Sequence, residues 1–261
     1  MRDLKITLIQ TEPVWEDIKG NIALFDEKIN DISEETELII LPEMFTTGFS
    51  MNASSLAQNM DGSSIKWLQK FSRQINADIV GSIIFANNGL YFNRLLWAKP
   101  DGHLFTYDKK HLFRFAGEEK IYSAGVGNIT VELNGWKIRP FICYDLRFPA
   151  WTRNIKNQYD IAVFIANWPE KRSMHWKSLL QARAIENQCY VIGVNRVGVD
   201  GNGLFYSGDS SVIDPLGKIT FQKHDEECTY TTALSFNTLK DYRKTFPAWM
   251  DSDIDMIKFP D

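Results

Sequence analysis

Apolar residues along the chain fall into short runs separated by polar and turn-forming residues. Runs such as Leu38–Leu41 and Ile161–Ala166 are apolar at every position, which is typical of strands that are covered on both faces. The predicted strands are Lys5–Ile9, Glu37–Leu41, Ile79–Phe85, Tyr91–Ala98, Lys137–Cys143, Ile161–Ala166, Tyr190–Val194, Ser210–Ile213, Lys218–Phe221 and Thr229–Leu234.

Three segments between these runs repeat their apolar residues at the three- and four-residue spacing of a helix. They are Asn21–Asn30, Ser63–Ile75 and Ser173–Asn187. Ser173 is a favourable residue for the N-cap of the last helix. Because predicted strands and helices alternate along the chain, the sequence predicts a layered α/β fold.

Composition and chain continuity favour one globular domain. The 261 residues are 44% hydrophobic and carry 29 Lys+Arg against 33 Asp+Glu, a net charge of −4. Such a composition excludes a disordered chain, and the missing positive charge argues against nucleic-acid binding. No linker divides the chain, so we predict a single domain over residues 1–261. Its tail, residues 241–261, carries aromatic residues that pack either on a second subunit, which we favour, or on the chain's own surface.

The sequence also bears on location and metal binding. Met1–Gln10 has no apolar signal-peptide region, and no apolar run approaches the ~20 residues that cross a bilayer. The three cysteines are an odd number without a Cys-x-x-Cys pair, which favours reduced thiols in the cytoplasm. We therefore expect a cytoplasmic protein without membrane contact. The four histidines lack metal-ligand spacing, and we expect no metal.

Reactive side chains follow three of the predicted strand regions. Glu43 comes just after an apolar run and a proline, Cys143 ends another run, and Tyr107–Phe113 contains a pair of lysines and a histidine. The carboxyl ends of strands are where α/β folds build their sites. Taken one at a time, these residues also fit a solvated loop glutamate, a charged turn and a buried apolar cysteine.

Cys143 has the most favourable context for a nucleophile. Free backbone N–H groups where a helix begins lower a thiol's pKa and can hold an oxyanion. A nucleophilic cysteine needs a base, and two candidates exist. His175 would give the more common Cys–His pair, whereas Glu43 with a lysine would give a less usual set. Residue types alone leave both open.

The order of the motifs resembles that of the nitrilase superfamily of carbon–nitrogen hydrolases. The three central motifs are Pro42-Glu43, Lys109-x-His111-Leu112 and Cys143-Tyr-Asp-x-Arg-Phe148. The resemblance extends over roughly Lys5 to Thr231. Further matching segments follow in the family's order: Ala166-Asn167, His175-Trp176, Ala182–Ala184, Glu186-Asn187, Tyr190-Val191, Asn195-Arg196 and Gly208–Gly217.

This resemblance implies a four-layer α-β-β-α sandwich and a Glu-Lys-Cys triad. By position, Glu43 matches the general base and Cys143 the nucleophile. Lys109 matches the catalytic lysine, because the family motif is Lys-x-His-Leu and Lys110 occupies its variable position. No cofactor is implied. Family members pair through a helical face that includes the helix after Cys143 and the Ser173 helix, which implies a homodimer or a higher homo-oligomer.

The resemblance also assigns supporting roles. A second glutamate supports the lysine in many members, and counting back from Gly125 selects Glu118, with Glu119 as the competing choice. The oxyanion is expected between Lys109 and the backbone N–H of Tyr144. His175 and His111 are then structural residues.

Within the superfamily, the closest likeness is to the omega-amidase branch. These enzymes deamidate small 2-oxo acids that carry a terminal amide, such as 2-oxoglutaramate and 2-oxosuccinamate, through a cysteine thioester. The segments that carry this likeness are Pro42–Ser50, Tyr107–Arg114, Cys143–Pro149, Ala166–Pro169 and Arg172–Leu180.

The implied partner is a small-molecule amide with a carboxylate, which arginine binds through both oxygens. Arg147 and Arg172 are the candidates, and Trp168 is a candidate pocket wall. Their alternatives are an ion pair of Arg147 with Asp145, a solvated helix start at Arg172, and core packing of Trp168. Nitrile hydrolysis, N-carbamoyl hydrolysis, a non-catalytic metabolite-binding relative and a redox-sensing thiol protein remain alternative functions.

Overall fold

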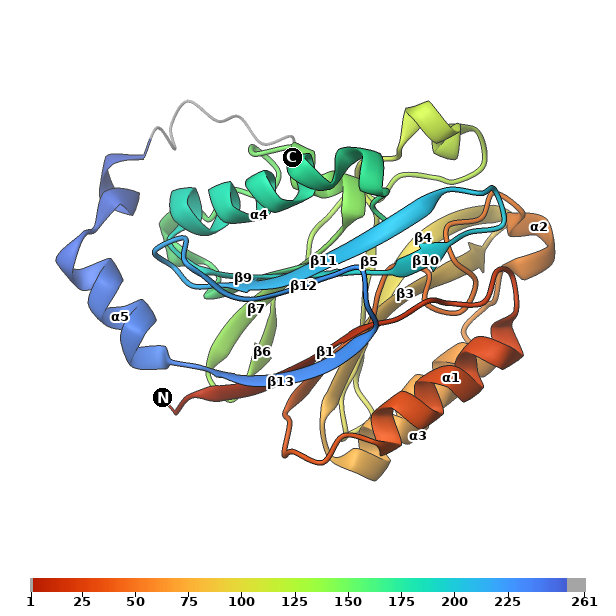
Figure 1. Ribbon diagram of the computed structural model, residues 1–261, viewed down its shortest axis with the longest axis horizontal. Helices are drawn as coiled ribbons and strands as arrows, with labels where there is room; N and C mark the ends of the chain where they lie inside the picture. Colours follow the sequence, from red (N-terminus) through yellow and green to blue (C-terminus); the bar gives the residue numbers. More distant parts are fainter. Residues whose placement is uncertain (1, 253–261) are drawn as a thin grey trace.

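Two β-sheets lie face to face in the computed structural model, which describes residues 2–252 (Figure 1). The first sheet has the order β13 (Cys228–Leu234), β1 (Leu4–Gln10), β2 (Leu38–Ile40), β3 (Asp78–Asn87), β4 (Leu90–Ala98), β5 (Leu104–Asp108). The second has the order β10 (Val197–Val199), β11 (Phe205–Ile213), β9 (Tyr190–Asn195), β8 (Ile161–Ala166), β7 (Trp136–Ile142), β6 (Val131–Leu133), with β12 (Ile219–His224) also on β11.

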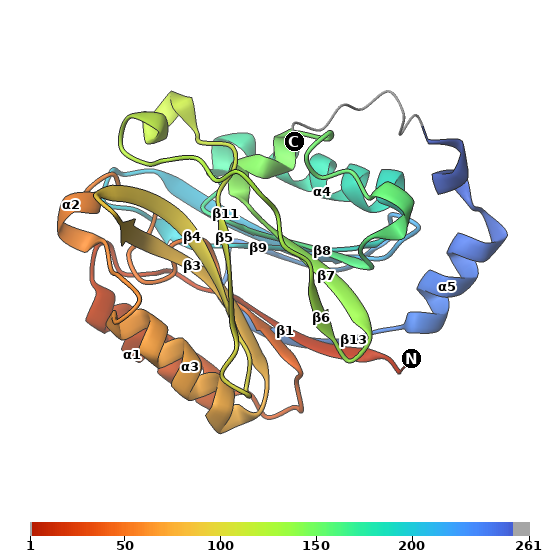
Figure 2. The same cartoon turned by 180° about the vertical axis from the view of Figure 1, so that it is seen from behind.

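Helices cover the outer faces of the two sheets (Figures 1 and 2). α1 (Ile18–Asn30) and α3 (Ser63–Ile75) lie on the first sheet, and α4 (Ser173–Asn187) lies on the second. The predicted four-layer α-β-β-α sandwich is therefore confirmed. Two further helices are short or peripheral: α2 (Ala53–Leu56) and α5 (Phe236–Thr245). Within residues 2–252, none of the helices has the length and apolar character needed to cross a membrane.

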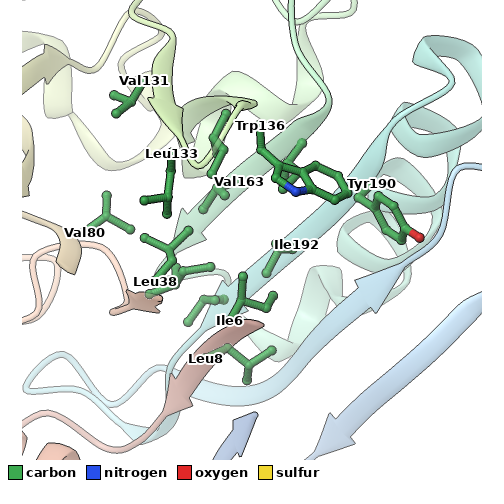
Figure 3. Close-up of a cluster of buried hydrophobic side chains, with 14 of the residues drawn as sticks. Ile6, Leu8, Leu38, Val80, Val131, Leu133, Trp136, Val163, Tyr190 and Ile192 are labelled. Carbon is green, nitrogen blue, oxygen red and sulfur yellow. The ribbon is translucent and has the colours of Figure 1, made fainter. Parts of the chain in front are cut away.

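The three largest apolar clusters of the core form layers. The central layer fills the space between the sheets, where Ile6 and Leu38 of the first sheet and Val163 and Ile192 of the second are fully buried (Figure 3). Separate clusters pack α1 and α3 on one outer face and α4 on the other. The inner strands therefore contact apolar side chains on both faces, which explains their continuous apolar runs.

All the predicted strands and the three predicted helices are present, with boundaries shifted by a few residues. The missed strands are β5, β6 and β10. β5 is partly exposed at a sheet edge, and the other two are only three residues long. The helices that were not predicted are α2, which has four residues, and α5, which is mostly polar and buries only Leu239.

The predicted N-cap of α4 is wrong. Ser173 is the first residue of the helix, and Arg172 occupies the N-cap without a capping hydrogen bond from its side chain. The Ser173 hydroxyl instead donates to Asp209 Oδ2 at 2.7 Å. The hydroxyl therefore ties the helix to β11 rather than capping its own first turn.

The described part of the C-terminal tail contacts its own chain. The Gln188 side chain donates to the carbonyl of Phe246 at 2.6 Å and accepts from the backbone N–H of Trp249 at 3.2 Å. Arg243, at the end of α5, forms an ion pair with Asp160 at 2.7 Å. Residues 253–261 of the predicted tail lie outside the described residues, and packing of the tail at a subunit interface stays a prediction.

Candidate active site

The site lies where strands of both sheets end. Glu43 follows β2, Lys109 directly follows β5, and Cys143 directly follows β7. β5 runs in the same direction as β3, because each is antiparallel to β4, and β3 is parallel to β2. All three side chains therefore come from carboxyl ends of strands, as expected for an α/β fold, although β5 itself was not among the predicted strands.

Glu43 is fully buried and held by hydrogen bonds on both oxygens. Oε1 accepts from Lys109 Nζ at 3.0 Å and from Asn93 Nδ2 at 2.7 Å. Oε2 accepts from the backbone N–H of Asn167 at 2.8 Å. These bonds fix the carboxylate beside the cysteine.

Sequence reasoning did not assign Asn93 or Asn167 to the site. Asn167 directly follows β8, and its side chain also donates to the backbone carbonyl of Glu43 at 2.7 Å. Its position at a strand end was a usable signal. Asn93 lies within β4, where nothing in the sequence marks it.

Lys109 has two carboxylate partners. Its Nζ lies 3.0 Å from Glu43 and 2.9 Å from Glu118, and none of the three side chains is exposed to solvent. Glu118 also accepts the backbone N–H of Phe113. Of the two competing glutamates, Glu118 is therefore the one that contacts the lysine. The neighbouring Lys110 places its ammonium over the Trp151 ring instead.

The buried charges shift the pKa values of the group. Burial opposes the charged form of Lys109, but the carboxylates of Glu118 and Glu43 outweigh it and raise the lysine pKa. Burial raises the pKa of Glu118, and Glu43 adds to the rise against the attraction of Lys109. Burial also raises the pKa of the Cys143 thiol well above its usual value, with a further rise from Glu43 and opposition from Lys109. A protonated thiol next to a carboxylate needs that carboxylate to take its proton.

Cys143 has a strained backbone. Its φ of 43° lies in the left-handed region, which is costly for residues other than glycine. The residue begins a short 3₁₀ helix, Cys143–Arg147. The N–H of Tyr144 lies in the first turn, where helix N–H groups have no partner within the helix. An oxyanion donor is thus available directly after the thiol.

A cavity of about 490 Å³ opens onto Cys143 and Lys109, and all three predicted substrate-binding residues line it. The Arg147 guanidinium lies 4.8 Å from the Trp168 ring centroid, and that of Arg172 lies 5.2 Å from the Phe113 ring. Apolar residues form another part of the wall: Phe49, Met51, Phe113 and Phe115. The cavity therefore combines a cationic side with an apolar side.

Two pairs that the sequence left open, Arg147 with Asp145 and Cys143 with His175, are not formed in the structure. Arg147 does not pair with Asp145; its guanidinium bonds the exposed ring of His175 at 3.0 Å. That contact pairs His175 with an arginine, whereas the ionisable groups that act on the Cys143 thiol are Glu43, Lys109 and Glu118. His111 stacks on Phe148 with 3.7 Å between ring centroids, as a packed histidine does.

Among residues 2–252, no three His, Cys, Asp or Glu side chains are grouped to hold a metal.

Comparisons with known proteins agree with this geometry. The chain is 48% identical over 256 residues to "Omega-amidase YafV" of Escherichia coli (strain K12), covering 97% of this chain and 98% of the relative. It is 35% identical over 235 residues to "2-oxoglutaramate amidase" of Bacillus subtilis (strain 168), covering 88% and 90% of the two chains.

Solved structures give the same result. The crystal structure of a CN-hydrolase superfamily protein from Xanthomonas campestris superposes with a TM-score of 0.96 at 44% identity, covering 100% of this chain and 99% of the other. A sequence model of the family described as carbon–nitrogen hydrolase matches residues 5–244. The resemblance to the nitrilase superfamily is thereby confirmed, and the chain belongs to the carbon–nitrogen hydrolase family.

Proposed function

We propose that the protein is an omega-amidase, which hydrolyses the terminal amide of small 2-oxo dicarboxylic acid monoamides such as 2-oxoglutaramate and 2-oxosuccinamate. The observation that carries the proposal is one cavity that presents Cys143 and Lys109 together with Arg147 and Arg172. Relatives named as an omega-amidase and a 2-oxoglutaramate amidase support the choice of substrate.

In the first step, the sulfur of Cys143 attacks the carbonyl carbon of the amide, and Glu43 takes the thiol proton. The raised pKa of the thiol makes this transfer necessary. Glu43 then returns the proton to the amide nitrogen, the C–N bond breaks, and ammonia leaves. The product on the enzyme is a thioester of Cys143.

In the second step, Glu43 takes a proton from water, and the resulting hydroxide attacks the thioester. The acid is released, and the sulfur regains the proton from Glu43. One carboxylate serves both steps because it lies beside the thiol and is held by Asn93 and Asn167. General acid–base help of this kind contributes on the order of 10²–10⁴ in rate.

The negative oxygen of each tetrahedral intermediate lies between Lys109 Nζ and the N–H of Tyr144. The ammonium remains charged because the carboxylates raise its pKa. Burial removes water that would screen its attraction for the oxyanion. Glu118 holds the ammonium from the other side at 2.9 Å.

Arg147 and Arg172 bind the carboxylate at the far end of the substrate. Stacking on aromatic rings orients both guanidinium groups. Nη2 of Arg147 contacts His175 Nδ1 at 3.0 Å, and its other N–H groups are left for the ligand. We expect Arg147→Lys and Arg172→Lys to raise KM for 2-oxoglutaramate more than they lower kcat, because lysine cannot bind both oxygens at once. Steady-state kinetics on each variant check this. An unchanged KM in both variants would show that other residues of the cavity bind the substrate carboxylate.

The test of the proposed function is ammonia release by the purified protein. The panel contains 2-oxoglutaramate, 2-oxosuccinamate, glutamine, asparagine, an aliphatic nitrile and an N-carbamoyl amino acid, with Cys143→Ala as the control. We expect fast release from the two 2-oxo amides and none from the variant, which should remain folded. Activity on another member of the panel alone would assign a different substrate to the enzyme. Turnover by Cys143→Ala would contradict the mechanism through a cysteine thioester.

A further inference from the structure

Asp145 connects the two chain segments that carry Lys109 and Cys143. It is fully buried two residues after the cysteine, and it lines no part of the cavity wall described above. We propose that Asp145 is a positioning residue that fixes the lysine and the thiol relative to each other. The proposal rests on the proposed function of the same site.

Both carboxylate oxygens of Asp145 accept two hydrogen bonds. Oδ2 accepts from the hydroxyl of Tyr107 at 2.6 Å and from the backbone N–H of Ile142 at 3.0 Å. Oδ1 accepts from the backbone N–H of His111 at 3.0 Å and lies 2.8 Å from its ring Nδ1. A carboxylate only accepts, so Nδ1 carries the hydrogen.

The residues that donate hydrogen bonds to Asp145 are close in sequence to Lys109 and Cys143. Tyr107 and His111 flank Lys109 by two residues on either side, and Ile142 directly precedes Cys143. β5, which leads to the lysine, belongs to the first sheet, whereas β7, which leads to the cysteine, belongs to the second. Asp145 therefore joins the carboxyl ends of strands from opposite sheets.

Neighbouring contacts stiffen this connection. Trp151 Nε1 donates to the Tyr107 hydroxyl at 3.1 Å, and the His111 ring stacks on Phe148 with planes 10° apart. The bond from Ile142 to Asp145 also closes the turn in which Cys143 has its left-handed φ of 43°. The same carboxylate thus holds the strained nucleophile and the lysine segment.

An amide at position 145 cannot replace the carboxylate. If its NH₂ faced Tyr107 and Ile142, the backbone N–H of Ile142 would face another donor. The Tyr107 hydroxyl, which already accepts from Trp151 Nε1 and from the backbone N–H of Lys110, would also lose its acceptor. If the NH₂ faced His111, the ring could change tautomer, but the backbone N–H of His111 would lose its acceptor. Asp145→Asn therefore leaves one backbone N–H unpaired in either orientation, and a buried unpaired donor is expected to move.

The first measurement compares Asp145→Asn with a matched control, Asp160→Asn. Asp160 directly precedes β8, so it lies at the amino end of the strand, whereas the active site lies at the carboxyl ends. Its side chain accepts a hydrogen bond from the backbone N–H of Lys137 at 3.0 Å. We expect kcat for 2-oxoglutaramate to fall on the order of 100-fold in Asp145→Asn with KM nearly unchanged, since a small misplacement of reacting groups has that effect. Asp160→Asn should change thermal unfolding but keep kcat.

The second measurement does not depend on turnover. The rate of Cys143 alkylation by iodoacetamide is followed against pH, with mass spectrometry separating this thiol from Cys189 and Cys228. We expect Asp145→Asn to change the pH profile for Cys143 and Asp160→Asn to leave it in place. A merely structural role would lower the unfolding temperature without moving the profile.

The outcomes separate the two proposals. Wild-type kcat and a wild-type alkylation profile in folded Asp145→Asn would overturn the role of Asp145. Should that variant fail to fold, Tyr107→Phe removes a single hydrogen bond, and we expect a smaller fall in kcat at constant KM; unchanged kcat there would overturn the role as well. Absence of ammonia release from the wild-type protein would instead remove the proposed function, while the alkylation profile would still report on Asp145.

Discussion

The thiol of Cys143 rests in its protonated form. Burial raises its pKa, and the negative charge of Glu43 adds to the rise. Many reactive cysteines are thiolates stabilised by a nearby cation, whereas here the cation, Lys109, is paired with the carboxylates of Glu43 and Glu118. The nucleophile is therefore generated only when Glu43 accepts its proton.

This electrostatic arrangement predicts the direction of a pH shift. Glu43→Gln removes a negative charge that raises the thiol pKa, so the pKa of Cys143 falls and more thiolate is present at any given pH. We expect the alkylation profile of Cys143 to move to lower pH, while turnover falls on the order of 10²–10⁴-fold because the base is lost. Glu119→Gln, the same change on a glutamate outside the lysine contact, should leave both unchanged. A shift to higher pH would contradict this account.

The two adjacent lysines should differ sharply. Lys109→Ala removes an oxyanion donor, and we expect kcat to fall on the order of 10²–10³-fold. Lys110→Ala removes only an ammonium that lies over the Trp151 ring, so activity should be retained. Steady-state kinetics on both variants provide the comparison, and the reverse result would mean that the other lysine is catalytic.

At the level of elements, the position of Glu118 depends on the turn that follows it. The N–H of Gly125 donates to the carbonyl of Lys109 at 2.9 Å. A Cβ on Gly125 would lie 2.1 Å from the carbonyl oxygen of Asp108, a backbone atom that cannot move aside. Only glycine lets this segment approach the end of β5, and the approach brings Glu118 to the lysine.

Gly125→Ala should therefore disturb both stability and catalysis. We expect a loss of about 1–3 kcal/mol in unfolding free energy, typical of overpacking, together with a lower kcat because Glu118 shifts from Lys109. Gly127→Ala is the matched control, since a Cβ there meets nothing within 4 Å. Thermal unfolding and kinetics on both variants decide the matter. Equal behaviour of the two would show that the close approach is unimportant.

At the level of the whole molecule, the two sheets share one central core while the site joins their strand ends. The family resemblance implies a homodimer through a helical face, and α4 exposes Met174 by 71% and Ile185 by 50%. These residues are three helical turns apart and so lie on one side of the helix. Leu216, 55% exposed, precedes Gly217, which lies against Ile185.

The exposed apolar residues at the two ends of this side of α4, Met174 and Ile185, with Leu216 beside Ile185, agree with a second subunit. We expect light scattering to give at least twice the mass of one chain, because exposed apolar residues are stabilised by burial between copies. Ile185→Asp should lower the mass towards that of a monomer, whereas Lys218→Asp, a substitution on the nearby turn, should not. A monomeric wild-type protein would contradict the prediction.

The amino-acid sequence was sufficient to predict the fold class, the main elements and the family. Apolar periodicity reports burial on a local scale, so the inner strands and the three main helices were predictable, whereas the edge strand β5 and the polar helix α5 were not. Motif order led to Glu43, Lys109 and Cys143 as candidate residues. It also selected Glu118, although only the structure shows that this carboxylate, and not Glu119, reaches the lysine.

The residues that surround those candidates are known only from the three-dimensional arrangement of the chain. Asn93 lies inside β4 and donates to Glu43, which follows β2, although β3 lies between these two strands in the sheet. Asp145 joins segments from opposite sheets, and Ser173 bonds β11 instead of capping its own helix. All these contacts join residues that are distant in sequence, and neither apolar periodicity nor motif spacing carries information about which distant partner a polar side chain will contact.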